Sequence, residues 1–205
     1  MRSVARLVGE LQGAIADERV LGAICAVPRE AFVPRALRSR AYENVALPIG
    51  ERQTISQPLV VARMTELLRL RPSDRVLDVG TGSGYHAAVL AQLAKHVWSV
   101  ERHRSLSEQA AANLEHAGVE NVTLVVGDGS RGLPDEAPFD AINVAAAAWP
   151  EVPPALERQL APAGRLIAPV GASGQQLVLV ERSPQNDVIR TKLDPVRFVP
   201  LIEGE

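Results

Sequence analysis

From residue 75 onward, short apolar runs alternate with stretches that have helical periodicity. The apolar runs lie at 76–79, 97–100, 122–126, 139–144, 165–170, 176–180 and 196–199. The helical stretches 85–94 and 106–116 lie between the earlier runs. Such alternation predicts a mostly parallel sheet with helices on both faces.

The last two apolar runs have no helical stretch between them. Residues 183–187, Ser-Pro-Gln-Asn-Asp, form a turn signal instead. We therefore expect runs 176–180 and 196–199 to pair antiparallel. The whole pattern predicts an α/β fold with a seven-strand sheet.

The first 50 residues have a different pattern from the rest of the chain. Apolar residues recur at helical spacing from Val4 to Ile15, and a second helical piece covers residues 20–26. Residues 40–54 show no period, and we expect an ordered loop there that could act as a lid over a site. A helix is expected at 57–70. We therefore expect a single domain, 1–205, with an N-terminal helical cap (1–56) and an α/β core (57–205).

Composition narrows the function classes. The chain has 205 residues, a formal net charge of −2 and only 3% aromatic residues, which gives no reason to expect nucleic acid as a partner. No apolar run reaches the roughly 18 residues of a membrane span, and the start does not resemble a secretory leader. A single cysteine, Cys25, excludes an intrachain disulfide and is expected to be a small core residue. We expect a cytoplasmic monomer with no membrane partner.

The sharpest local signal is a strand that enters three alternating glycines, Gly80, Gly82 and Gly84, ahead of a helix. Glycines there allow a tight turn and a close approach of the backbone to a ligand. The spacing G-x-G-x-G differs from the dinucleotide pattern G-x-G-x-x-G. Asp78 precedes the first glycine by two residues, and its carboxylate would repel a pyrophosphate but suit a cationic ligand.

Two further carboxylates follow the next predicted strands. Glu101 ends the second apolar run, where an acidic residue can accept both ribose hydroxyls. Asp128, beside Gly129 after the third run, can accept from a base-edge amino group such as adenine N6. Together with Asp78 they indicate a pocket for a nucleoside linked to a cationic amino acid, which describes S-adenosylmethionine. Taken singly, each also fits an ordinary turn or a surface ion pair.

These residues resemble the protein-L-isoaspartate (D-aspartate) O-methyltransferase family. The resemblance runs from about residue 27 to 201. Its segments are Pro28-Arg-Glu-Ala-Phe-Val-Pro34, Ala41-Tyr-Glu-Asn44, Leu47-Pro-Ile-Gly50, Gln53-Thr-Ile-Ser-Gln-Pro58, Val76-Leu-Asp-Val-Gly-Thr-Gly-Ser-Gly-Tyr85, Gly127-Asp-Gly129, Ala137-Pro-Phe-Asp-Ala-Ile142, Val152-Pro-Pro-Ala-Leu156, Gly164-Arg-Leu166, Pro169-Val-Gly171 and Phe198-Val-Pro-Leu201. The stretch 54–58 is far more specific than the glycine loop, which many methyltransferases share.

The resemblance implies a Rossmann-like methyltransferase that repairs damaged proteins. Such an enzyme transfers a methyl group from S-adenosylmethionine, leaving S-adenosylhomocysteine, to the α-carboxylate of L-isoaspartyl residues, with D-aspartyl residues as a further acceptor class. The ester then closes to a succinimide. The implied cofactor-binding residues are Asp78, Gly80, Thr81, Gly82, Ser83, Gly84, Glu101, Arg102, Asp128 and Gly129. The implied acceptor-binding residues are Thr54, Ile55, Ser56, Val144, Ala145 and Ala146, with Ser56 also catalytic.

The implied chemistry needs no general base and no metal. A carboxylic acid ordinarily has a pKa of about 4 and is already ionised at pH 7, so the enzyme must align the reactants and exclude water. Ser56 is therefore expected to orient the acceptor or the methyl donor; a helix N-cap ahead of Pro58 is a compatible interpretation. The four histidines, His86, His96, His103 and His116, are expected to be surface or structural residues.

Four departures from the family pattern leave the acceptor open. Ala145 stands where a Thr is common, Trp149 is an apparent insertion, Leu59 replaces an aromatic or His, and Glu51-Arg52 replaces a small pair. The alternative is a methyltransferase of the same fold that acts on another protein carboxylate or on a small molecule. Two further alternatives are a cofactor-binding protein without turnover and a nicotinamide oxidoreductase.

Overall fold

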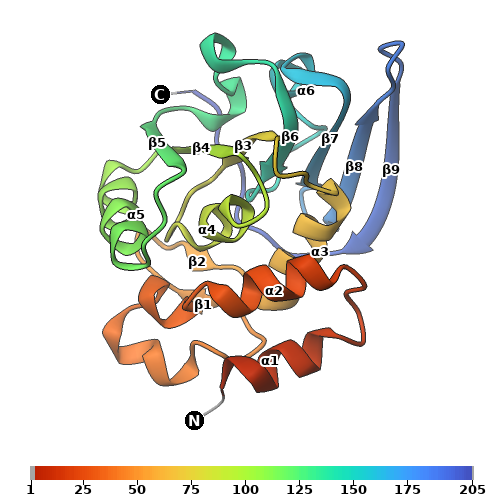
Figure 1. Ribbon diagram of the computed structural model, residues 1–205. Coiled ribbons are helices and arrows are strands. Elements are labelled where there is room, and N and C mark those ends of the chain that lie inside the picture. Colours follow the sequence, from red (N-terminus) through yellow and green to blue (C-terminus); the bar gives the residue numbers. More distant parts are fainter. Residues whose placement is uncertain (1–2, 205) are drawn as a thin grey trace.

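A computed structural model describes residues 3–204, and its centre is a seven-stranded sheet with the order β5-β4-β3-β6-β7-β8-β9 (Figure 1). Neighbouring strands from β5 to β7 pair parallel, and β8 and β9 complete the sheet antiparallel. The strands are β3 (Arg75–Val79), β4 (His96–Glu101), β5 (Val122–Val126), β6 (Phe139–Val144), β7 (Leu160–Val170), β8 (Gln176–Arg182) and β9 (Val188–Pro195). The predicted α/β fold with a mostly parallel seven-strand sheet is confirmed.

The register of the central strands places three polar residues in one row. Asp78 on β3 is paired with Ser99 on β4 and with Asn143 on β6. Strands in a parallel sheet point their carboxyl ends to one edge, so the loops that follow β3, β4, β5 and β6 all open at that edge. The functional residues expected after these strands therefore gather there.

Helices cover both faces of the sheet, but unequally. The helix α3 packs on β6 and β7, and α4 packs on β3 and β4. The opposite face is covered by the short α6 and by residues of the connecting loops, such as Val152 and Leu133. The helices are α1 (Val4–Leu11), α2 (Glu18–Ala26), α3 (Pro58–Leu68), α4 (Tyr85–Ala91), α5 (Arg104–His116) and α6 (Pro154–Arg158), with 3-10 turns at Arg29–Phe32, Arg35–Arg40, Gly129–Arg131 and Pro134–Glu136.

The N-terminal helices α1 and α2 form a layer beneath α3 and α4 (Figure 1). Their buried face joins a cluster that includes Leu7, Ile24 and Phe32 from this layer and Tyr85 from α4. Hydrophobic burial is therefore shared between the N-terminal layer and the sheet domain, as expected for one folding unit.

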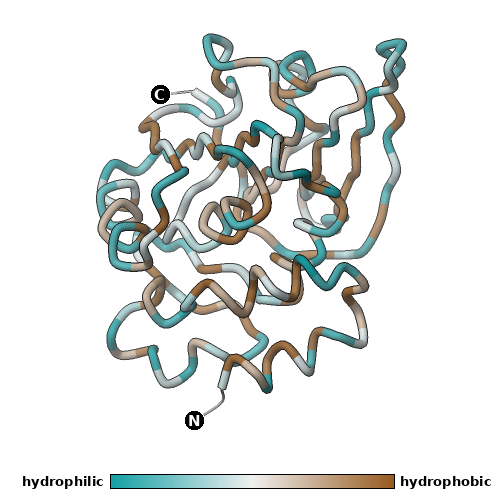
Figure 2. The backbone as a smooth tube through the Cα atoms, viewed as in Figure 1, coloured by the Kyte–Doolittle hydropathy of each residue, from teal (hydrophilic) through white to brown (hydrophobic). Residues whose placement is uncertain are grey.

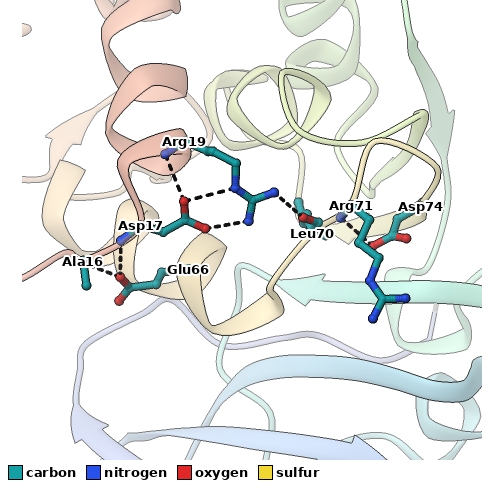
Figure 3. Close-up of polar contacts among 7 residues, drawn as sticks. All are labelled: Ala16, Asp17, Arg19, Glu66, Leu70, Arg71 and Asp74. Atoms are coloured by element: carbon teal, nitrogen blue, oxygen red, sulfur yellow. Dashed lines mark hydrogen bonds and ion pairs between the residues drawn. The ribbon is translucent and has the colours of Figure 1, made fainter.

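Polar contacts also fasten the N-terminal layer to α3 (Figure 3). Glu66 Oε1 accepts hydrogen bonds from the backbone N–H groups of Ala16 (2.6 Å) and Asp17 (3.0 Å). Arg19 pairs with Asp17 and donates from Nη1 to the carbonyl of Leu70 at 2.9 Å. These bonds fix the start of α2 against the end of α3.

The aperiodic segment 40–54 is ordered, but it is more than a loop. It contains β1 (Leu47–Pro48), which pairs antiparallel with β2 (Thr54–Ile55). We call residues 47–55 the ribbon. Its tip holds Glu51 and Arg52 at positive φ, 50° and 58°, which a turn of two left-handed residues requires.

The last strand differs from the prediction. Residues 196–199 are not a strand; β9 runs over Val188–Pro195. The turn at 183–187 formed as expected, and it pairs Arg182 directly with Val188. Because a tight turn fixes the register of a hairpin, the partner of β8 has to begin at 188. The apolar run 196–199 comes too late to pair and instead crosses toward the carboxyl edge of the sheet.

Two smaller expectations also fail. Ile15 lies beyond the end of α1, although its side chain is buried. Cys25 is exposed and is not a core residue, because the buried stripe of α2 runs through Val20, Leu21, Ala23 and Ile24. Residues 1, 2 and 205, which belong to the expected domain 1–205, lie outside the described part of the chain.

The distribution of hydropathy matches this architecture. Hydrophobic segments concentrate in the inner strands and helices, and the turn between β8 and β9 at the upper right is hydrophilic (Figure 2). Within residues 3–204, no helix has the length and apolarity needed to cross a bilayer.

Candidate active site

A cavity opens at the carboxyl edge of the sheet, above β3 and β4. It is walled by the ribbon, the glycine loop, the segment after β4, the segment after β6 and the crossing residues 199–202. Its lining residues are Gln53, Thr54, Ile55, Ser56, Val61, Val79, Gly80, Thr81, Gly82, Ser83, Tyr85, His86, Val100, Glu101, Arg102, His103, Gly129, Ala145, Ala146, Val199, Pro200, Leu201 and Ile202.

The glycine loop turns back over the sheet in a conformation that favours glycine. Gly80, Gly82 and Gly84 have φ values of 94°, 54° and 88°. The ribbon packs directly on this loop, because a Cβ on Gly82 would lie 3.5 Å from Ile49 Cδ1. The loop therefore presents backbone to the cavity at Gly80 and Gly82, while Gly84 lies outside the lining and caps α4.

Glu101 is built into the cavity wall and is only 6% exposed. Its Oε2 accepts from the backbone N–H of Gly82 at 2.9 Å, and its Oε1 accepts from the backbone N–H of His103 at 3.0 Å. The surface ion pair considered from sequence is therefore wrong. A carboxylate offers about four acceptor positions, so about two remain for donors of a ligand.

Asp78 lies beneath the cavity and does not line it. Its side chain is fully buried, and its oxygens accept from Ser99 Oγ and Asn143 Nδ2, both at 2.7 Å. Burial raises the pKa of the Asp78 carboxyl to about 6, against the lowering effect of the two hydrogen bonds. Asp78, predicted from the sequence to face a cationic ligand, is therefore separated from the cavity by the glycine loop and is held by Ser99 and Asn143.

Asp128 stands beside the cavity, and its neighbour Gly129 lines it. Asp128 Oδ1 accepts from the N–H and the hydroxyl of Ser130, and Oδ2 accepts from the N–H of Gly204 at 2.9 Å. Partial burial raises the pKa of Asp128, but these hydrogen bonds outweigh it and hold the pKa below its usual value. The chain that follows β9 therefore reaches the end of β5.

The acceptor residues implied by resemblance line the cavity, with one exception. Thr54, Ile55, Ser56, Ala145 and Ala146 are in the lining. Val144 is not; it ends β6 inside the core.

Ser56 also lines a second hollow, together with Thr54, Ala145 and Val199. This second hollow lies between the ribbon and residues 195–199. Ser56 is not a helix N-cap, because α3 begins at Pro58 with Gln57 as its N-cap and no side-chain capping bond. Ser56 thus lies where the two hollows meet.

Sequence reasoning missed part of the wall. His86, expected to be structural, is buried in α4 and also lines the cavity, as does His103. Residues 199–202 contribute a whole side of it, where the carbonyl of Val199 accepts from Ala147 N–H at 2.7 Å and Leu201 N–H donates to the Ala147 carbonyl at 2.8 Å. The only sequence signal for this segment was the family-like stretch Phe198-Val-Pro-Leu201.

The residues present fit S-adenosylmethionine. The spare acceptor positions of Glu101 suit a diol, the glycine loop leaves room for close approach, and apolar Val79 and Val100 line the wall between them. No group of three or more His, Cys, Asp or Glu side chains within residues 3–204 is arranged to hold a metal ion.

Comparison with known proteins gives a consistent picture. Over residues 3–205 the chain matches the family described as protein-L-isoaspartate(D-aspartate) O-methyltransferase. It is 55% identical over 194 residues to the protein-L-isoaspartate O-methyltransferase of Serratia proteamaculans, covering 95% of this chain and 92% of that protein. It is 54% identical over 206 residues to that of Dechloromonas aromatica, covering 99% of this chain and 94% of the relative.

Solved structures agree. A protein-L-isoaspartate O-methyltransferase structure superposes with a TM-score of 0.88 at 31% identity, covering 98% of this chain and 66% of that one. A Plasmodium falciparum structure, described as a β-aspartate methyltransferase in complex with S-adenosyl-L-homocysteine, has a TM-score of 0.85 at 26% identity and covers both chains fully.

Proposed function

The chain belongs to the protein-L-isoaspartate (D-aspartate) O-methyltransferase family, and we propose on that premise how its residues methylate isoaspartyl carboxylates. The activity is the transfer of a methyl group from S-adenosylmethionine to the α-carboxylate of L-isoaspartyl residues in damaged proteins. The observation that carries it is the family match over residues 3–205 together with a cavity at the carboxyl edge of the sheet.

The proposed cofactor site divides into residues that contact the cofactor and residues that support them. Glu101 would hold the ribose hydroxyls with its free acceptor positions, and the glycine loop would cover the amino-acid end. The contacting set is Gly80, Thr81, Gly82, Ser83, Glu101, Arg102 and Gly129. Asp78 and Gly84 support the loop, and Asp128 stands at the rim, where it would accept from the adenine amino group.

The proposed acceptor site is the junction of the two hollows at Ser56. An extended peptide would lie in the hollow between the ribbon and residues 195–199, with its isoaspartyl carboxylate reaching past Ser56 into the cavity. Thr54, Ile55, Ala145 and Ala146 would line its path. The Ser56 hydroxyl donates a hydrogen bond that orients the carboxylate, and no side chain needs to remove a proton.

S-adenosylmethionine held by these residues would supply a sulfonium methyl group for an acceptor oxygen, and the electron pair of the broken C–S bond would stay on sulfur. The protein's task is to align the carboxylate and to exclude water. Ile55 of the ribbon and Leu201 of the crossing segment line the cavity and provide apolar walls for that purpose.

We propose that the chain forms a single domain with two parts, as expected from the sequence. Residues 1–56 form the cap and supply the ribbon and Ser56, and residues 57–205 form the cofactor-binding core. Shared burial across α1, α2 and α4 supports a single unit. We also propose a cytoplasmic monomer without nucleic acid partners; size-exclusion chromatography with light scattering and cell fractionation would test this.

A matched peptide pair tests the function. The enzyme with S-adenosylmethionine carrying a labelled methyl group should transfer base-labile label to an isoaspartyl peptide and not to its aspartyl twin. Label on neither peptide, with S-adenosylhomocysteine still bound in calorimetry, would contradict the acceptor. A parallel screen of other carboxylates by S-adenosylhomocysteine release tests the alternative that Ala145 and the 66% exposed Trp149 change the acceptor.

A further inference from the structure

A chain of buried polar side chains runs beneath the glycine loop. It begins at Thr81 in the loop, passes through Ser99 and Asp78, and continues through Asn143 to His86. The successive heavy-atom distances are 2.7, 2.7, 2.7 and 3.1 Å. Each of these five residues is buried.

The chain ends on α3, the helix that follows Ser56. His86 Nε2 lies 3.2 Å from Thr65 Oγ1, and Thr65 belongs to α3. The network therefore connects the loop expected to hold the cofactor with the helix that begins two residues after the acceptor serine. It crosses β4, β3, β6 and α4 on the way.

The hydrogen-bond directions follow from proton counting. Asp78, when ionised, only accepts, so Ser99 donates to it and must itself accept from the Thr81 hydroxyl. Asn143 Nδ2 has two hydrogens, one for Asp78 Oδ1 and one for His86 Nδ1. His86 then carries its single proton on Nε2 and donates it to Thr65. Burial lowers the pKa of His86 to about 3, so the ring is neutral, as this direction requires.

The hydrogen bond from Nδ2 to Asp78 decides which way the amide of Asn143 points, because the amide oxygen makes no hydrogen bond of its own. Within the described residues 3–204, Asn143 Oδ1 is buried without a hydrogen-bond partner. Turning the amide over would place this oxygen against the Asp78 carboxylate. A buried acceptor left unpaired is costly, so its retention points to a gain elsewhere, which is the charge-assisted bond to Asp78.

We infer that Asn143 and His86 are positioning residues for the cofactor site, which hold the Asp78 carboxylate in the orientation that anchors Thr81 through Ser99. The inference rests on the proposed role of the glycine loop in cofactor binding. Neither residue was among those expected at the site, and Asn143 does not touch the cavity. Asn143 acts through Asp78, and His86, which also lines the cavity, supports Asn143, so their removal should change cofactor affinity before it changes acceptor affinity.

The test replaces Asn143, which donates to Asp78, with a side chain of similar volume that cannot donate a hydrogen bond. Asn143→Leu leaves Asp78 with Ser99 as its remaining side-chain donor, which favours the protonated carboxyl. Calorimetry with S-adenosylhomocysteine should give an affinity about tenfold lower than wild type near neutral pH. The loss should shrink as the pH is raised, because a higher pH favours the ionised carboxylate of Asp78. The KM for an isoaspartyl peptide should not change.

Other groups near Asp78 do not give this pH profile. The charged and titratable side chains that face it are Glu101 from β4 and, through Asn143, His86 from α4. Both side chains remain in Asn143→Leu, and the buried His86 ring, with its pKa lowered to about 3, is neutral at every pH of the test. A merely structural role for Asn143 would lower stability at every pH without restoring affinity at high pH.

Two substitutions of His86 test the inference independently, in case Asn143→Leu does not fold. His86→Gln keeps an acceptor for Asn143 and a donor for Thr65 and should retain S-adenosylhomocysteine affinity within about twofold. His86→Leu removes both and should lose affinity severalfold. Equal affinities in wild type, His86→Gln and His86→Leu would overturn the inference. If wild type itself fails to bind S-adenosylhomocysteine, the proposed function fails instead.

Discussion

Glu101 Oε2 accepts a hydrogen bond from the backbone N–H of Gly82 at 2.9 Å, so the carboxylate expected to hold a ribose also fixes the glycine loop. In Glu101→Gln, an amide N–H group would face either the Gly82 or the His103 N–H, and one charge-assisted bond is lost. Such bonds contribute about 1.5–3 kcal/mol, so affinity for S-adenosylhomocysteine in calorimetry should fall at least about tenfold. Glu108→Gln, on the exposed side of α5, is the control and should bind as wild type.

Ser56 lies where the two hollows meet and should affect turnover more than cofactor binding. Ser56→Ala removes the hydroxyl that orients the acceptor, and the kcat for an isoaspartyl peptide should fall about tenfold or more. The dissociation constant of S-adenosylhomocysteine should change by less than about twofold, because Ser56 forms no part of the glycine loop. Equal losses in both quantities would remove Ser56 from the acceptor site.

Gly129 touches the core so closely that a methyl group does not fit. A Cβ there would lie 2.5 Å from Val79 Cγ1, and Val79 is buried. Gly129→Ala should lower the free energy of unfolding by about 1–3 kcal/mol and weaken cofactor binding. Gly127→Ala is the matched control, since a Cβ at Gly127 meets nothing within 4 Å. Denaturant titration of the two variants measures the difference; similar midpoints would contradict the prediction.

Arg52 occupies a left-handed conformation at the exposed tip of the ribbon, with φ of 58°. Relief of this strain in Arg52→Gly gains about 1–2 kcal/mol, and the greater freedom of glycine in the unfolded chain costs about 0.5–1 kcal/mol. The net gain should raise Tm by about 2 °C in thermal unfolding. Arg52→Ala also removes the side chain but keeps the strain, so a similar rise in Tm for Arg52→Ala would show that strain is not the cause.

His86 makes stability depend on pH. Burial lowers its pKa from 6.5 to about 3, so between these values the unfolded chain binds a proton that the folded chain does not. The neutral His86 ring therefore makes its full contribution to the unfolding free energy above pH 6.5, and this contribution is lost as the pH falls toward 3. Relative to His86→Gln, wild type should lose about 2 kcal/mol of unfolding free energy between about pH 6.5 and 5. Urea titrations at both pH values measure this difference.

The contribution of Asp78 to stability has the opposite pH dependence to that of His86. Its raised pKa, about 6, means that the folded chain holds an extra proton between 3.8 and 6, so this group favours stability as the pH falls. Asp78 is present in wild type and in His86→Gln, and its contribution cancels in the comparison. A wild-type stability that follows that of His86→Gln across this pH range would contradict a neutral buried His86.

Local patterns in the sequence were enough for the sheet and for most of the cofactor edge. Alternating runs and helical stretches fix a parallel sheet, because each element can bury its apolar face only against the others. The glycine loop follows β3 directly and Glu101 is the last residue of β4, and the carboxyl ends of parallel strands meet at one edge whatever the details of packing. The family-like stretch 54–58 predicted the acceptor-binding residues around Ser56.

Only the tertiary structure decided which of these residues face the cavity. Asp78 is the next-to-last residue of β3 and Val144 is the last residue of β6, and both are buried, whereas Gly80 and Ala145, which follow the ends of these strands, line the cavity. Residues 199–202, about 120 positions after the glycine loop, reach the cavity through contacts with Ala147 that no local pattern predicts.

The partnership of Asn143 with Asp78 and His86 likewise depends on strand register. A polar residue in an apolar run predicts that its buried side chain needs a hydrogen-bond partner. The identity of that partner depends on which strands lie side by side. Sequence determined the elements and the chemistry available at their ends, because these follow from residues that are neighbours in the chain. The structure decided burial, partners and the walls of the site, because these depend on contacts between residues far apart in the sequence.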